Sequence, residues 1–232
     1  MTPRAWLSTW SGLRPLIKPD RDVNASKVSR EHHVESMPGF ITIAGGKLTT
    51  YRRMATEALR TAIKWLREHD DGFEAAGRER SGTKHRPLPG AVGLESADLA
   101  GVAAIGRALI ADHGIDGEVA THLCGVYGAR AGLLGAAIAA DRALGERMNP
   151  DLHYVWAEVE FAVAEDRART IDDVLSRRVP LLLVGRQQGL DVCEAVADRM
   201  AARLGWSADE RARQIAAYQR VVADSRRFRT AP

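Results

Sequence analysis

The residues with the clearest chemical potential form a short glycine turn. In chain order they are Gly45, Gly46, Lys47, Leu48 and Thr49. Paired glycines let a ligand approach the backbone closely. The first amides of the helix expected after the turn lack partners inside that helix, and the helix dipole adds partial positive charge beside the lysine ammonium. The turn therefore predicts a site for an anion or an electron-rich heterocycle. The alternative is a plain strand-to-helix turn with a solvated lysine.

Two arginines upstream of the turn could bind an anion together. Arg14 lies in a short apolar run that includes Pro15, and Arg30 begins a strand-like run. Arginines on neighbouring strands can hold a phosphate or a carboxylate through bidentate hydrogen bonds. The alternative is local pairing, for example of Arg30 with Glu31 or Glu35. The turn itself is not a nucleotide P-loop, because the long glycine-rich run before a Lys-Ser/Thr pair is missing.

The histidines do not predict a metal centre. His32 and His33 are adjacent, so in a strand they point to opposite faces. The other five histidines are scattered without the spacing of metal ligands. No metal is therefore expected, and the sequence leaves the catalytic residue and the general base unknown.

Strands and one helix must position the glycine turn. Strand-like runs cover residues 29–36 and 40–44, and a helix is expected to follow the turn as far as Leu66. The apolar face predicted for this helix consists of Leu48, Tyr51, Ala55, Ala58, Leu59, Ala62, Ile63 and Leu66. Residues 70–92 are rich in glycine, proline and mixed charges and indicate a linker.

Beyond the linker the patterns indicate helices. Apolar periodicity predicts helices at residues 99–110, 119–127, 131–148, 156–167 and 180–204. Capping boxes predict a short helix opening at residues 170–173 and a last helix opening at residues 207–210. We therefore expect a mainly α fold, in which residues 93–229 form a helical bundle and residues 1–69 form a small β/α domain.

Composition narrows the class of protein. Apolar residues make up 45% of the chain and charged residues 27%, which is ordinary for a globular protein. A net charge of +3 from interleaved charges does not predict nucleic-acid binding. The longest apolar stretch is too short to predict a membrane-spanning helix. The two cysteines, Cys124 and Cys193, have no CxxC partner, which favours a reduced, cytoplasmic chain.

Several runs, taken together, resemble one family. Residues 9–16 (TWSGLRPL), 29–32 (SREH) and 43–52 (IAGGKLTTYR) stand in the order and spacing of FAD-dependent glycerol-3-phosphate dehydrogenases of the aerobic type. Residues 127–131, 156–163 and 170–178 resemble the helical C-terminal domain of the same enzymes. The resemblance covers nearly the whole chain.

The resemblance implies an oxidoreductase that converts sn-glycerol 3-phosphate to dihydroxyacetone phosphate, with the hydride passing to N5 of FAD and the electrons to quinone. It implies that Arg14 and Arg30 bind the substrate phosphate and that the glycine turn lies against the flavin. The Gly-x-Gly-x-x-Gly motif for the FAD pyrophosphate is absent, so we expect the chain to be a C-terminal portion that is inactive alone.

Expected partners are therefore glycerol 3-phosphate and a complementing chain that carries the FAD half. The full-length enzyme would be peripheral to the inner face of the cell membrane. Two alternatives to an enzyme part stay open at this point: a non-enzymatic helical interaction module, or a truncated remnant.

Overall fold

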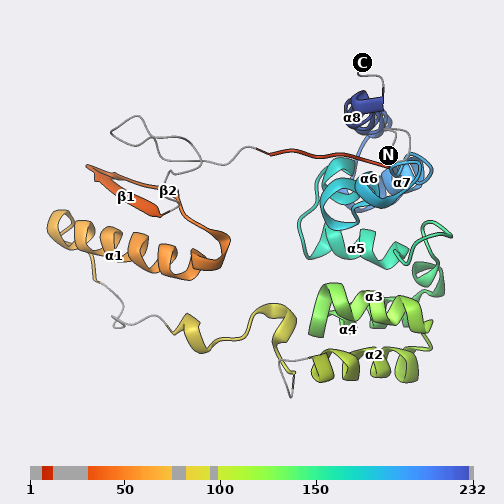
Figure 1. The fold of residues 1–232 in the computed structure, drawn as a ribbon, viewed down its shortest axis with the longest axis horizontal. Coiled ribbons are helices and arrows are strands. Elements are labelled where there is room, and N and C mark those ends of the chain that lie inside the picture. Colours follow the sequence, from red (N-terminus) through yellow and green to blue (C-terminus); the bar gives the residue numbers. More distant parts are fainter. Residues whose placement is uncertain (1–6, 13–30, 75–81, 95–98, 230–232) are drawn as a thin grey trace. The chain divides into compact units, whose positions relative to one another are not determined.

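The computed structural model describes residues 7–12, 31–74, 82–94 and 99–229. The chain divides into two compact units, one formed by Ser11–Arg86 and the other by Met1–Trp10 together with Pro87–Pro232 (Figure 1). The dividing point lies within the predicted linker of residues 70–92. The finer domain boundaries expected from the sequence stay predictions.

The smaller unit is a β-hairpin packed on one helix. Strands β1 (His32–Met37) and β2 (Phe40–Gly45) pair antiparallel through a two-residue turn, with His32 opposite Gly45 and Met37 opposite Phe40. The turn residue Gly39 has a φ of +73°, which suits the second position of a Pro-Gly turn. After a 3-10 turn, helix α1 (Tyr51–His69) runs along the hairpin. The strands and the helix predicted here are confirmed.

The face of α1 that packs on the hairpin differs from the predicted one. Met54, Ala58 and Leu66 are half-buried, whereas Tyr51 and Leu59 are exposed. The prediction was wrong for these two residues, and also for Leu48 and Ala55, which are exposed, because two apolar stripes run along this helix and only one can face a two-stranded sheet. None of the described residues of this unit is fully buried, which indicates a small core.

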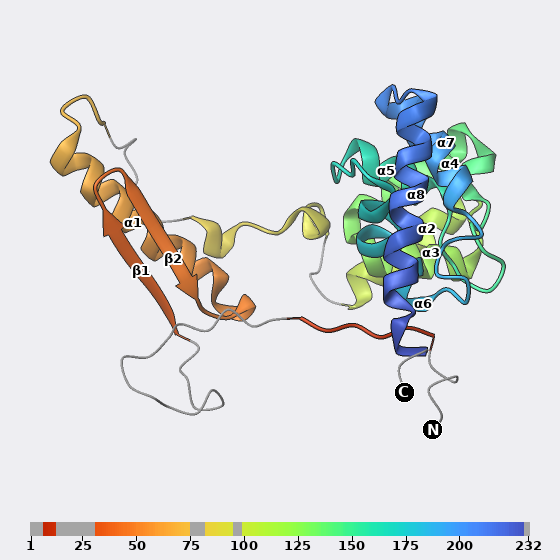
Figure 2. The ribbon, with the colours of Figure 1, turned by 90° about the horizontal axis from the view of Figure 1, so that it is seen from above.

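The larger unit is a bundle of helices (Figure 2). Its first three helices are α2 (Leu99–His113), α3 (Gly117–Tyr127) and α4 (Ala131–Ala140). They are followed by α5 (Trp156–Ala164) and a π-helical segment, η8 (Asp173–Arg178). The last three are α6 (Leu181–Val184), α7 (Cys193–Leu204) and α8 (Ala208–Ser225). The mainly α class is confirmed.

Helix α5 lies between two hydrophobic clusters. One cluster joins α2, α3 and α4 with Ala157 and Phe161 of α5. The other joins η8, α6, α7 and α8 with Val159 and Ala162 of α5. Because both sides of α5 are buried, its sequence shows apolar residues all round rather than a single stripe.

Three predicted helices are shorter than expected, and the one predicted at residues 156–167 ends at Ala164. The helix predicted at residues 131–148 ends at Ala140, because Asp141 caps a separate 3-10 turn by accepting a hydrogen bond from the amide of Ala143 at 3.0 Å. The helix predicted at residues 180–204 is divided into α6 and α7. Gln188 and Gly189 have positive φ values, +56° and +77°, which no helix accommodates.

The predicted capping box at Thr170 is confirmed, and at Ser207 the structure shows the N-cap hydrogen bond of the predicted box. The amide of Asp173 donates to Oγ1 of Thr170 at 3.0 Å, and the amide of Thr170 donates to Oδ2 of Asp173 at 3.0 Å. The amide of Glu210 donates to Oγ of Ser207 at 3.1 Å, ahead of α8. Both pairs satisfy amides that the helix itself leaves free.

The segment Gly117–Ala140 is, by length and composition, apolar enough to cross a membrane. The backbone breaks at Gly128, where φ is +57° and ψ is −133°, so that α3 and α4 are two helices that pack on each other. Leu123 and Leu134 of this segment are buried in the core. The match is therefore weak evidence for a membrane span, since core helices share the same composition.

Candidate functional site

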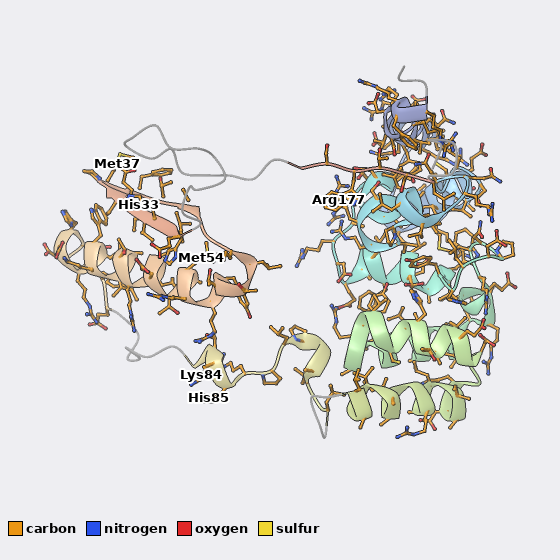
Figure 3. All side chains as sticks on the ribbon, in the orientation of Figure 1. His33, Met37, Met54, Lys84, His85 and Arg177 are labelled. Carbon is orange, nitrogen blue, oxygen red and sulfur yellow. The ribbon has the colours of Figure 1, made fainter. Side chains whose placement is uncertain are left out.

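The predicted glycine turn is a sharp change of direction between β2 and α1. Gly45 and Gly46 have φ values of +72° and +87°, a region that side chains strongly disfavour. A Cβ added at Gly46 would lie 2.5 Å from Sδ of Met54 and 3.3 Å from Cβ of His32. Met54 lies between α1 and the hairpin (Figure 3). The turn is therefore packed from below and carries no side chain at Gly46.

The hydroxyl of Thr50 fixes the second half of the turn. The amide of Lys47 donates to Oγ1 of Thr50 at 3.4 Å, and this hydroxyl donates to the carbonyl oxygen of Lys47 at 3.0 Å. The amide of Thr50 also donates to that carbonyl oxygen, at 3.0 Å. Lys47 is thus held in an extended conformation, with φ of −131°, while its side chain stays exposed.

The amides of Leu48 and Thr49 open the 3-10 turn that precedes α1. Within the part of the chain that the structure describes, neither amide has a hydrogen-bond acceptor. The side chain of Leu48 is 88% exposed, so an apolar surface lies next to these two donors. The α-helix proper begins at Tyr51, after this 3-10 turn, so the start of its dipole is separated from Lys47 by three residues.

A side-chain hydrogen bond links the hairpin to α1. Nε2 of His32 lies 2.8 Å from Oε2 of Glu57, and the side chain of His32 is nearly buried. His33 is exposed, so the expectation that the two histidines point to opposite faces is confirmed. No cluster of three or more potential metal ligands occurs among the residues that the structure describes.

The turn fits a planar, electron-rich group such as a flavin. The positive φ values of Gly45 and Gly46 set the turn, the amides of Leu48 and Thr49 have no acceptor among the described residues, and Lys47 supplies a positive charge. The assignment of Gly45, Gly46, Lys47, Leu48 and Thr49 to a cofactor stays a prediction. Arg14 and Arg30 lie outside the described residues, so their assignment to the substrate phosphate also stays a prediction.

The helical unit contains a buried polar network that the sequence analysis did not identify. Glu158 is fully buried, and its Oε1 accepts hydrogen bonds from Tyr127 at 3.0 Å and from Nε2 of His122 at 2.9 Å. Its Oε2 accepts from the amide of Val155 at 2.8 Å. The only sequence signal was the position of Glu158 in the first turn of a helix, where an acid can cap the chain before it. The network joins α3 to α5.

A hollow of about 430 Å³ in the same unit is lined by several charged side chains. Arg130 pairs with Glu165 at 3.0 Å, and Arg178 donates to the carbonyl oxygen of Asp166 at 2.8 Å. Arg177, which projects from η8 in Figure 3, pairs with Asp172 at 2.6 Å. Because neighbouring acids already neutralise these arginines, the hollow offers an anion little net attraction.

Two tyrosines, Tyr127, which is partly buried, and Tyr218, which is fully buried, predict a decrease in stability at alkaline pH. Burial, followed by the charge of Glu158, raises the pKa of Tyr127 above its ordinary value of 10.0. Burial likewise raises the pKa of Tyr218, whose hydroxyl donates to the carbonyl oxygen of Gln188 at 2.7 Å. A tyrosine whose pKa is higher in the folded state than in the unfolded state stabilises the fold at pH values below its unfolded-state pKa. The contribution of these two tyrosines to the free energy of unfolding should therefore decline progressively above a pH of about 10.

Urea unfolding followed by circular dichroism between pH 8 and pH 11 would measure this decline. Tyr127→Phe should lessen it, whereas Tyr51→Phe, at an exposed position, should leave it unchanged. If the free energy of unfolding falls equally steeply with pH in the two variants, the decline does not come from Tyr127.

A family model described as the C-terminal domain of alpha-glycerophosphate oxidase matches residues 81–211, which is more than half of the chain. This chain belongs to that family. The match spans α2 to α7 and the first residues of α8, so it covers most of the helical unit described above.

Several curated proteins are similar to this chain along most of its length. The mitochondrial glycerol-3-phosphate dehydrogenase of Rattus norvegicus is 32% identical over 87% of this chain and 26% of its own length. The probable mitochondrial glycerol-3-phosphate dehydrogenase of Caenorhabditis elegans is 34% identical over 90% of this chain and 28% of its own length. The glycerol-3-phosphate dehydrogenase of Synechocystis is 29% identical over 90% of this chain and 36% of its own length.

These similarities confirm the family resemblance read from the motifs. The chain spans about a quarter to a third of the length of these relatives. The alignments with these relatives extend beyond the residues that the family model matches. Because they cover 87–90% of the chain, residues outside 81–211 must also align.

Proposed function

We propose that this chain is the C-terminal part of an FAD-dependent glycerol-3-phosphate dehydrogenase, which oxidises sn-glycerol 3-phosphate to dihydroxyacetone phosphate. The relatives named for this activity align with nearly the whole chain, including the unit that holds the glycine turn. The observation that carries the proposal is the turn at Gly45 and Gly46, which places two amides without an acceptor among the described residues beside the exposed Lys47.

The residues of the turn would serve the reaction by electrostatics. Bound FAD would supply the oxidant, taking a hydride from the alcohol carbon while the hydroxyl proton leaves to a base outside the residues assigned here. The amides of Leu48 and Thr49 and the ammonium of Lys47 would favour an electron-rich ring, because fixed dipoles and charges stabilise negative charge without reorganising. Arg14 and Arg30 would hold the substrate phosphate.

The FAD pyrophosphate motif would come from a further part of the protein or from a separate chain. The hairpin supports such a partner, since each of its strands has one unpaired edge among the described residues, and Phe40 is 61% exposed. Open strand edges and exposed apolar side chains favour pairing with another segment. A quinone as electron acceptor and peripheral contact of the complete enzyme with a membrane belong to the same proposal.

We also propose a reducing compartment, the cytoplasm, for this chain. Cys124 and Cys193 are both free and buried, which agrees with a chain that needs no disulfide. Burial raises the pKa of Cys193 to about 11, so its thiol should be unreactive at neutral pH.

The proposal predicts that activity depends on Lys47 and on an FAD-bearing partner. The purified chain alone should be colourless. Co-expression with the FAD-containing portion of the Synechocystis relative should yield a flavin-containing complex that glycerol 3-phosphate bleaches. Lys47→Ala should lower kcat/KM of that complex by about 10²-fold or more, since one electrostatic donor at a reacting centre contributes on that scale.

The matched control is Lys64→Ala, which removes an exposed lysine of α1 that lies 4.0 Å from Glu68. This control should retain activity. If Lys47→Ala and Lys64→Ala bleach the flavin at the same rate, the turn does not face the cofactor.

A second candidate function is a non-enzymatic interaction module. It is favoured by the exposed apolar residues of the hairpin, Met37 and Phe40. The same co-expression separates the two: a complex that contains flavin but is not bleached by glycerol 3-phosphate favours the interaction module.

A further inference from the structure

His32 lies where the hairpin, the glycine turn and α1 come together. In the strand register it stands opposite Gly45, the last residue of β2. Its Cβ is 3.3 Å from the point that a Cβ added at Gly46 would occupy. Its ring reaches α1, where Nε2 lies 2.8 Å from Oε2 of Glu57. The side chain of His32 is only 12% exposed, whereas its neighbour His33 is exposed.

The hydrogen bond between His32 and Glu57 closes a small loop around the glycine turn. Residues 46–50 connect the end of β2 to the start of α1, which runs along the hairpin (Figure 1). The pairing of β1 with β2 holds the first end of this connection, and Glu57 belongs to the helix that holds its second end. The hydrogen bond therefore fixes the distance between the two ends of the connection that carries Lys47.

Packing alone would hold this distance less firmly. The side chain of Met54 also packs against the turn, with Sδ 2.5 Å from the Cβ added at Gly46. A methionine has three rotatable bonds and adapts to the gap that it fills, so it sets no direction. A hydrogen bond to a carboxylate, in contrast, requires a narrow range of distances and angles. The directional contact next to the turn is therefore the one made by His32.

We propose that His32 is a positioning residue for the glycine turn. Its Nε2 donates to the carboxylate of Glu57, because an ionised carboxylate only accepts. This bond sets the orientation of the turn and so the direction of the amides of Leu48 and Thr49. Donors of this kind serve a site only while they are held within about 0.5 Å of the required geometry. That the turn serves a flavin rests on the proposed function, whereas the control of the turn by His32 does not.

The first test measures the exchange of the Thr50 amide with solvent, by NMR of the chain alone. This amide donates to the carbonyl oxygen of Lys47 at 3.0 Å, so its exchange reports opening of the turn. His32→Phe keeps a planar ring but removes the donor. It should accelerate the exchange about three- to tenfold, because a single hydrogen bond contributes on that scale. The matched control is His33→Phe, the same change at the exposed neighbour, which should keep the parent rate.

Two further variants make the test specific to the hydrogen bond. His32→Gln, whose side-chain amide can still donate to Glu57, should restore most of the parent rate. Glu57→Ala should accelerate the exchange as much as His32→Phe. The variant with both changes should exchange no faster than either single variant, because the two substitutions remove the same bond.

The amides of Ala62 and Ile63, inside α1, report the stability of the whole hairpin–helix unit. They should exchange in His32→Phe as in the parent chain. Equal exchange of the Thr50 amide in His32→Phe and His33→Phe would overturn the proposal. An equal acceleration throughout α1 would also overturn it, since His32 would then stabilise the unit without positioning the turn.

The second test uses the flavin-containing complex that the proposed function predicts. His32→Phe should lower kcat by about tenfold or more with KM for glycerol 3-phosphate unchanged, because a small misplacement near a reacting centre can cost about 10²-fold. His32→Gln should recover the rate. If the parent complex is not bleached, the proposed function fails, and the exchange of the Thr50 amide still decides whether His32 positions the turn. If the parent is bleached and His32→Phe reacts as fast as His33→Phe, the inference fails while the proposed function stands.

Discussion

Replacing Glu158 by alanine is expected to lower the free energy of unfolding of the helical unit by about 3–5 kcal/mol. Removal of a buried carboxylate leaves every donor around it without an acceptor, and each such group retains its desolvation cost. Glu158 has three donors around it, which are the amide of Val155, the hydroxyl of Tyr127 and Nε2 of His122. The substitution also opens a cavity between the two core clusters.

The variant Glu158→Gln separates the effect of side-chain volume on stability from the effect of hydrogen bonding. Glutamine keeps the volume but turns an amide group toward one of the donors, so we expect a loss of about 2–3 kcal/mol. The matched control is Glu165→Gln on the end of the same helix, where the exposed carboxylate pairs with Arg130 and should contribute less than about 1 kcal/mol.

Urea unfolding with a common m-value measures all three variants. A loss in Glu158→Gln no larger than that in Glu165→Gln would show that the network is not a principal link between α3 and α5.

Replacing Gly128 by alanine is expected to lower the free energy of unfolding by about 2–4 kcal/mol. The residue has φ of +57° and ψ of −133°, a conformation that is essentially restricted to glycine. The added Cβ would also collide with the carbonyl oxygen of Gly90, which is backbone and cannot move aside cheaply. The cost therefore combines backbone strain with displacement of the turn at Pro89–Ala91.

Two glycines serve as controls for this substitution. Gly205 has φ of +69° and ψ of 35° with open space where a Cβ would be added, so Gly205→Ala should cost only about 1–2 kcal/mol from the left-handed conformation. Gly125 lies within α3 and also has open space, so Gly125→Ala should be neutral or stabilising by about 0.5–1 kcal/mol. Thermal unfolding would rank the three variants, and equal losses at Gly128 and Gly205 would exclude the collision.

The order of the helices and strands could be predicted from the sequence because local residue patterns indicate each element. Strand-like runs of residues predicted both strands, and the capping boxes at Thr170 and Ser207 marked helix starts that the structure confirms. The glycine pair before Lys47 indicated a turn with unusual dihedral angles, and both glycines have positive φ. These features depend on residues within a few positions of each other.

The helix ends and the buried face of α1 could be determined only from the tertiary structure. The break between α6 and α7 depends on Gln188, whose buried side chain accepts a hydrogen bond from Arg226 at 2.6 Å and donates one to Ser225 at 3.1 Å. Such partners lie almost forty positions away, and no local pattern identifies them. The choice between the two apolar stripes of α1 depends likewise on where the hairpin packs.

The sequence by itself determined the family, the mainly α class and the chemical character of the glycine turn, because all three are encoded in short runs of residue types. The tertiary structure decided which groups meet: His122, Tyr127 and Val155 around Glu158, Ser8 with Leu183, and Leu7 with Arg229. The physical reason is that burial and long-range hydrogen bonding depend on contacts between distant parts of the chain. Each such contact closes a loop at a cost in entropy, and the contacts together offset this cost only when the whole unit has formed.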